Sequence, residues 1–160
     1  MGIRYLAISI DQQDYEHVRR GTCQTCGEEP RLRDLGDEAD TRRETLDLDK
    51  SWHYYQQVLA TEPARPAAAL VDGHVTNTYW GWRSHQGLLS NSDVAAIAQD
   101  LAKVTPALVR ERLFAERSPG FGPDDRAQQD VDYVCHYLPQ AQEFTQRVAD
   151  EGRSILYFIG

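Results

Sequence analysis

The segments Ile3-Arg-Tyr-Leu-Ala-Ile-Ser-Ile10 and Ser154-Ile-Leu-Tyr-Phe-Ile159 decide the fold of this chain. Both are short and rich in β-branched and aromatic residues, which is typical of β-strands. Each is mostly apolar on both faces, and this pattern favours a central rather than an edge position in a sheet. We therefore expect the two segments, from opposite ends of the chain, to be neighbours in one small mixed or antiparallel sheet.

Between these strands, the apolar residues mostly follow the spacing of amphipathic helices. About five helices are expected: from about 12 to 20, from Asp47 or Asp49 to about Ala60, from about 93 to 103, from Pro106, and from about Asp124 to Gly152. Asp11 is the predicted N-cap of the helix over 12–20, Ser90 or Ser92 that of the helix over 93–103, and Thr105 that of the helix from Pro106. Pro139 is expected to kink or split the last helix. Helices in runs beside few strands predict an α+β fold.

Two further segments have no helical period. Residues 21–45 hold glycines, Pro30 and many charges, and we interpret them as a long polar loop. Residues 67–71 and 74–78 flank Asp72-Gly73, a dipeptide that favours a type I′ turn, so a tight hairpin is expected there, although the alanines would also suit a helix.

Composition excludes several classes of protein. The chain has 160 residues and a formal charge of -8, and one domain spanning 1–160 is the natural interpretation of that length. No apolar run is long enough for a membrane span, and the N-terminus lacks the basic region of a signal peptide. Three cysteines fit a reducing cytoplasm. The acidic balance argues against nucleic acid and is compatible with a basic partner.

Three segments resemble the YfbM-like family of bacterial single-domain α+β proteins of unknown function. They are Leu46-Asp-Leu-Asp-Lys-Ser-Trp-His53, Ser92-Asp-Val-Ala-Ala-Ile-Ala98, and Phe144 through Gly152 with the apolar strand that follows. Relatives often carry a Gly-Tyr-Gly-Pro-like turn before the second segment, whereas this chain has Thr78-Tyr-Trp-Gly-Trp-Arg83. The resemblance implies the fold and supplies no catalytic residues.

Cys23 and Cys26 have the spacing of half a zinc site. No second pair of thiols follows, and Cys135 lies in the apolar stripe of the last helix, as an inert buried cysteine does. We therefore predict no required cofactor and keep a zinc-stabilised loop as the weaker alternative.

Asp47, Asp49, Lys50 and His53 form the densest group of ionisable residues on one predicted element. With Trp52 beside them, Asp49 and His53 at i, i+4 would make a small polar site, in which the carboxylate holds the imidazole. The interpretation that we favour is structural, because aspartates in a first helical turn cap the helix and complement its dipole.

Tyr79-Trp80-Gly81-Trp82-Arg83 concentrates aromatic surface around one glycine, and His85 follows it. Such residues dominate binding hot spots, although both tryptophans would equally serve to seal a core.

Common nucleotide, hydrolase and zinc-protease motifs do not occur in the sequence. Our first hypothesis is an acidic cytoplasmic interaction protein without catalytic activity, whose partner is a basic protein. The alternative is a small-ligand binder or enzyme with a cleft near Asp49, His53, Trp80 and Trp82.

Overall fold

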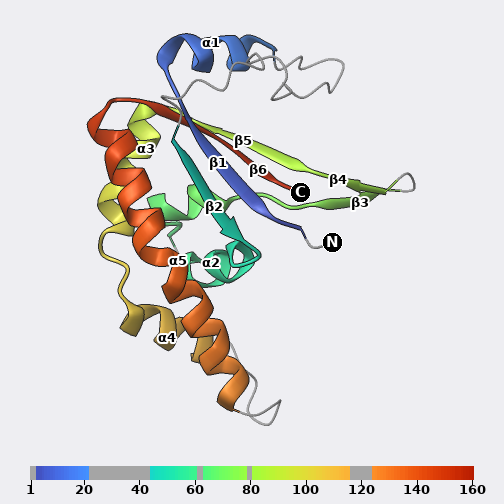
Figure 1. The fold of residues 1–160 in the computed structure, drawn as a ribbon, viewed down its shortest axis with the longest axis vertical. Coiled ribbons are helices and arrows are strands. Elements are labelled where there is room, and N and C mark those ends of the chain that lie inside the picture. The colour runs from blue at the N-terminus through green and yellow to red at the C-terminus, as the bar shows by residue number, and fades with distance from the viewer. Residues whose placement is uncertain (1–2, 22–43, 61–62, 79–80, 116–123) are drawn as a thin grey trace.

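The structure is a computed structural model that describes residues 3–21, 44–60, 63–78, 81–115 and 124–160. Its main sheet is antiparallel with strand order β2-β1-β6-β5, and the terminal strands lie side by side at its centre (Figure 1). The strands are β1 (Tyr5–Ile10), β2 (Thr45–Asp49), β5 (His85–Leu89) and β6 (Ser154–Ile159). Arg4 and Gly160 extend the central pair by exchanging two backbone hydrogen bonds of 2.9 Å. The predicted α+β fold and the pairing of the terminal strands are therefore confirmed.

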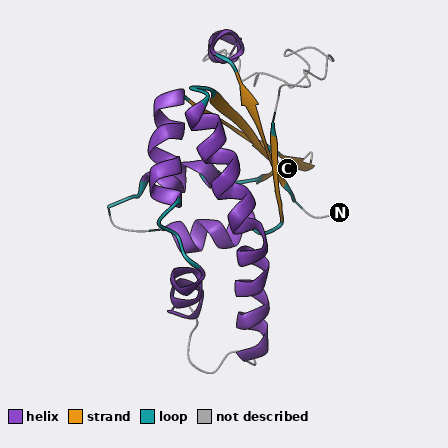
Figure 2. Cartoon of the chain, turned by 60° about the vertical axis from the view of Figure 1, so that its left-hand side comes forward, coloured by secondary structure: helices purple, strands orange, loops and turns teal. Residues whose placement is uncertain are grey.

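One face of the sheet carries the main core, because alternate residues of each strand point toward a layer of helices. Figure 2 shows these helices gathered on one side of the strands. They are α2 (Trp52–Leu59), the 3-10 helix η2 (Pro66–Val71), α3 (Asn91–Leu101), α4 (Pro106–Ala115) and α5 (Asp124–Asp150). Tyr5 and Ile155 belong to this buried cluster together with the apolar stripe of α5. That stripe is Val131, Val134, Leu138, Ala141, Phe144 and Val148, all predicted by the helical spacing, whereas Cys135, which the spacing also placed there, is only half-buried.

The other face of the sheet has a smaller core. Helix α1 (Gln12–Gly21) packs Val18 against Ile8, Ile10 and Leu156. Farther along the sheet, Leu6 keeps 37% of its surface exposed.

The predicted helix boundaries are largely confirmed. Asp11 accepts a hydrogen bond of 2.8 Å from the backbone of Asp14, and Ser90 forms a capping box with Asp93. Thr105 caps α4, and Gly152 has the positive φ of 65° expected after a helix. Helix α5 is assigned without interruption through Pro139, so the predicted split does not occur.

The predicted helix start at Asp47 or Asp49 is wrong. Residues 45–49 form edge strand β2, and α2 begins only at Trp52. Leu46 and Leu48 are buried while Thr45 and Asp47 are exposed, which is the period of two of a strand with one covered face. Either aspartate could cap a helix, but only a strand buries both leucines. Burial of two leucine side chains contributes more free energy than one helix cap.

The predicted hairpin over residues 67–78 is also wrong. Residues 66–71 form η2, with Ala67, Leu70 and Val71 buried. The hydroxyl groups of Tyr5 and Tyr157 bind the backbone carbonyls of Leu70 and Asp72, which holds this segment against the core. A separate two-stranded ribbon pairs β3 (Thr76–Thr78) with β4 (Gly81–Arg83).

The expected polar loop over 21–45 lies mostly outside the described residues, and both of its predicted end residues belong to other elements. Gly21 ends α1 and Thr45 begins β2, while residues 22–43 lie outside the described part of the chain. Among the helices that the structure describes, none is both long and apolar enough to cross a membrane.

Candidate functional site

Asp49 is the centre of a polar site where β2 ends. Its φ of 47° is the only positive value among the non-glycine residues that the structure describes, and aspartate is one of the few side chains that tolerate it. Its carboxylate accepts a hydrogen bond of 2.6 Å from the Tyr133 hydroxyl on α5 and lies 3.0 Å from Nε of Arg4. The Lys50 backbone N–H donates to the same hydroxyl at 3.3 Å. The turn after β2 is thereby attached to the middle of α5.

The electrostatics of this contact fix the protonation of both partners. The hydrogen bond from Tyr133, with the nearby Arg4 charge, lowers the pKa of Asp49 below its ordinary value. Removal from water, with the hydrogen bond to Asp49, raises the pKa of Tyr133 to about 12. At neutral pH, the carboxylate is therefore a charged acceptor and the phenol a neutral donor.

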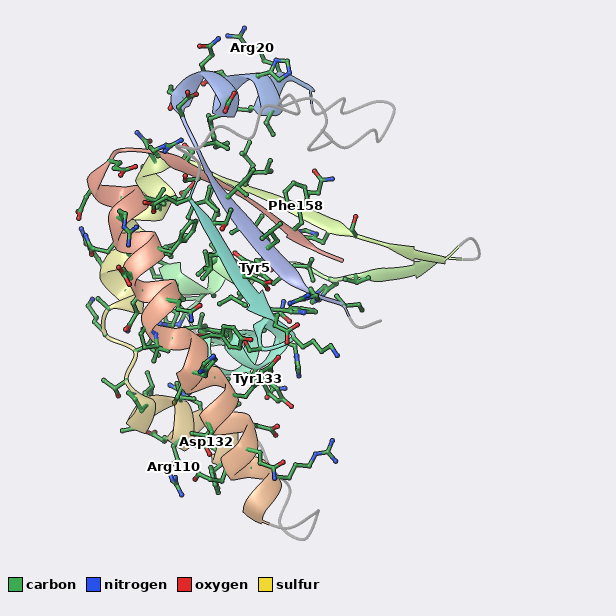
Figure 3. All side chains as sticks on the ribbon, viewed as in Figure 1. Tyr5, Arg20, Arg110, Asp132, Tyr133 and Phe158 are labelled. Carbon is green, nitrogen blue, oxygen red and sulfur yellow. The ribbon has the colours of Figure 1, made fainter. Side chains whose placement is uncertain are left out.

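Around this contact, α2 and α5 contribute an aromatic cluster. Its members are Trp52, His53, Tyr54, Tyr133, His136 and Tyr137. The ring centroids of His53 and Tyr54 are 3.9 Å apart, and those of Tyr133 and Tyr137 are 5.5 Å apart in an edge-on arrangement. The Tyr54 hydroxyl donates to Asp130 at 2.8 Å. Figure 3 shows Tyr133 on α5 at the level of α2.

This surface contains four of the residues singled out in the sequence. Asp49, Lys50, Trp52 and His53 all lie at the junction of β2 and α2. The predicted one-turn helical pairing of Asp49 with His53 is wrong, because Asp49 ends a strand. Its carboxylate binds Tyr133 and Arg4, while the His53 ring packs against Tyr54.

The remaining predicted residues are not gathered at this junction. His85 lies on β5, at the opposite edge of the sheet, with its ring centroid 6.0 Å from that of Tyr157. Trp82 and Arg83 belong to β4, of which the structure describes only the backbone. Trp80, Cys23 and Cys26 lie outside the described residues. Within the described ranges, no group of three or more His, Cys, Asp and Glu residues could hold a metal ion.

Sequence reasoning missed Arg4, Tyr54, Asp130, Tyr133, His136 and Tyr137. Tyr133 and Tyr137 are one helical turn apart on α5, and that spacing was a usable signal. Tyr54 follows His53 directly. Arg4 gave no signal, because it meets Asp49 only after β1 and β2 have paired with a shift in register between Tyr5 and Leu6.

A cavity of about 410 Å³ lies between the start of β2 and α5. Its lining residues are Glu44, Thr45, Gln140, Glu143, Phe144 and Arg147. Arg147 bridges two carboxylates, at 2.9 Å from Glu44 and 2.6 Å from Glu143. Tyr133 and Arg147 thus contact the two ends of β2 from one helix.

Together, the four-stranded sheet, the helices on one face and the polar aromatic junction define an α+β domain with a surface site. The chain belongs to the family described as domain of unknown function DUF1877, whose model matches residues 1–158. It is similar to the crystal structure of YfbM from Escherichia coli, a protein of unknown function. The identity is 18% and the TM-score 0.62, over 99% of this chain and all of the other. The expected YfbM-like family is confirmed. No curated protein matches the chain.

Proposed function

We propose that this protein is a cytoplasmic, non-catalytic interaction protein that binds a basic segment of a partner protein. The binding surface is the aromatic cluster with the carboxylates of Asp47, Asp49 and Asp130 around it. The observation that carries the proposal is the placement of partly buried aromatic rings beside ionised carboxylates.

This chemistry suits lysine and arginine side chains. Aromatic faces attract cations, and a carboxylate forms a charge-assisted hydrogen bond with a guanidinium or ammonium group. Tyrosine and tryptophan bury a large area while keeping a polar group at hand, so they favour binding at low entropic cost. Asp47 and Asp49 both bind the Arg4 guanidinium, which holds the two carboxylates together beside the rings.

The charge of the whole chain supports the same partner. A formal charge of -8 speeds encounter with a basic protein and repels nucleic-acid phosphates. No bond-making step is needed for this function.

The test is a titration of the isotope-labelled protein with a short arginine-rich peptide, followed by backbone amide chemical shifts. We expect the largest changes at the aromatic cluster and weaker binding as salt rises. Tyr137→Ala should weaken binding by roughly fivefold or more, because an interface tyrosine typically contributes at least about 1 kcal/mol. The matched control is Tyr15→Ala on α1, which removes a half-buried tyrosine from the other face of the sheet.

A glutamate-rich peptide of the same length completes the experiment. If it binds as tightly as the basic peptide, or if the two alanine variants behave alike, the proposed surface is wrong.

A further inference from the structure

Strand β2 offers an open edge for pairing. In the main sheet it pairs only with β1, so within the described residues its outer side carries no strand. Ser9 donates a backbone hydrogen bond of 2.9 Å to the Glu44 carbonyl, and Leu46 lies opposite Ala7 two residues further on. In an antiparallel pair, successive residues alternately direct their backbone N–H and C=O groups toward the partner strand and away from it. The backbone groups of Thr45 and Asp47 therefore point outward, which is the template that an added strand uses.

Helix α5 lies alongside the whole of β2 and extends beyond it (Figure 1). Tyr133 contacts Asp49 at the end of β2, and Arg147 contacts Glu44 just before its start. These helix residues are about 21 Å apart at 1.5 Å per residue, close to the roughly 17 Å that five strand residues span. The cavity lies at the Glu44 end of this stretch, with Phe144, only 5% exposed, among its lining residues. Strand β2 and α5 thus lie alongside one another over the length of the strand, with a hollow at one end.

We propose that the partner's basic segment lies along this edge in an extended conformation and adds to β2 as an antiparallel strand. This inference rests on the proposed function, since it specifies how the basic segment binds. The aromatic cluster then contacts one end of the segment, and the carboxylates of Glu44 and Glu143 lie at the other.

The side chains of β2 specify the pattern of that segment. Thr45 and Asp47 point to the exposed face of the sheet, and Leu46 and Leu48 point to the core. In an added strand, alternate side chains lie on the face of Asp47, where basic residues pair best. The residues between them lie on the side of α5 and Phe144, where apolar side chains fit. The expected ligand alternates basic and apolar residues.

A second copy of this chain fits the edge poorly. Antiparallel pairing of β2 with itself, centred on Asp47, would place the Asp47 carboxylates of two chains opposite one another, and like charges across strands are destabilising. Each chain also carries a net charge of -8, so two copies repel one another.

The experiment measures fluorescence anisotropy of the full chain with a labelled, end-capped peptide of alternating arginine and valine. Two further peptides carry backbone N-methyl groups, either on every arginine or on every valine. The residue opposite Asp47 turns its own N–H toward β2, so methylation of the arginines removes the inter-strand hydrogen bonds and methylation of the valines does not. We expect the first to weaken binding by roughly tenfold or more and the second to have little effect.

The protein is varied in the same experiment. Thr45→Pro removes an outward N–H that the added strand needs, whereas Thr45→Val keeps it, and proline is tolerated on an edge strand. We expect weaker binding for the proline variant only, with circular dichroism confirming its fold. If it fails to fold, the methylated peptides alone decide.

The outcomes separate the two proposals. Binding of the unmodified peptide, with equal affinities for the two methylated peptides, would overturn strand addition and leave the basic-partner function standing. No binding of the unmodified peptide would overturn both.

Discussion

The Tyr133 hydroxyl lies 2.6 Å from a carboxylate oxygen of Asp49, although 84 residues separate the two in sequence. This contact joins the end of an edge strand to the longest helix of the described structure. It places a charged acceptor beside aromatic rings, and the proposed binding surface depends on it.

Tyr133→Phe should raise the pKa of Asp49 toward its ordinary value, because the hydrogen bond from Tyr133 is the largest cause of the depression. A carboxyl group whose pKa is lowered by folding stabilises the protein at pH values above its unfolded pKa, and this stabilisation is lost as pH falls through the folded pKa. The variant lacks part of this stabilisation at neutral pH, so it should lose less stability in acid than the wild type. The carboxyl carbon shift of Asp49, followed by NMR between neutral and acidic pH, measures the change. Tyr137→Phe is the control, and equal Asp49 titrations in the two variants would contradict the assignment.

The positive φ of residue 49 should make the protein more stable with glycine than with alanine at this position. Both Asp49→Gly and Asp49→Ala remove the carboxylate, but only glycine adopts a φ of 47° without steric cost. The glycine variant should therefore be the more stable by about 1 kcal/mol. Urea unfolding of the pair tests this, and an alanine variant at least as stable as the glycine variant would show that the strain is absent.

Asp100→Asn should destabilise the protein by about 2 kcal/mol at neutral pH, since hydrogen bonds to charged groups contribute more than neutral ones. The Asp100 carboxylate accepts hydrogen bonds of 2.8 Å from Nε and Nη2 of Arg65 and one of 3.0 Å from the Ala67 backbone, with only 14% of its side chain exposed. The Arg65 hydrogen bond lowers the pKa of Asp100, so this stability is present above the unfolded pKa of about 3.9 and is lost as pH falls through the folded value.

Urea unfolding at a series of pH values measures the difference between wild type and Asp100→Asn. Glu111→Gln, an exposed change on α4, is the matched control and should shift stability little. A difference that persists undiminished in strong acid would mean that the Asp100 charge is not its cause.

Gly87→Ala should destabilise the protein by about 2 kcal/mol through overpacking. Gly87 lies opposite Tyr157 across β5 and β6, and a Cβ atom there would collide with the Tyr157 ring. That ring cannot easily move, because it stacks on Tyr5 at 5.6 Å and its hydroxyl binds the Asp72 carbonyl.

A double-mutant cycle identifies the collision. Tyr157→Leu should cost less in the Gly87→Ala background than in the wild type. Gly152→Ala is the comparison, because a Cβ atom there meets nothing within 4 Å and only the positive φ is strained. Additive effects of Gly87→Ala and Tyr157→Leu would contradict the proposed clash.

The elements that could be predicted are those whose patterns are local. The apolar faces of the terminal strands and of α5 define their burial without reference to the rest of the chain. Residues 45–49 and 66–71 were misassigned, because each is short and its state depends on partners distant in sequence. Residues 45–49 form a strand only because β1 is present to pair with them.

The candidate site divides in the same way. Asp49, Trp52 and His53 stood out because they are dense in one stretch of sequence. Tyr133 and Arg4 could not be connected to them, since two strands and a helix must assemble before the three segments meet. The positive φ of Asp49 likewise has no signature in the sequence beyond the residue type.

The central place of β6 has a consequence for biosynthesis. This strand is synthesised after every other element that the structure describes, yet it lies between β1 and β5. Until β6 has been made, β1 has no partner on that side, and its apolar edge is open to faulty pairing. The sheet closes only once Ile159 has been synthesised, so the pairing that joins β1 to β6 forms late.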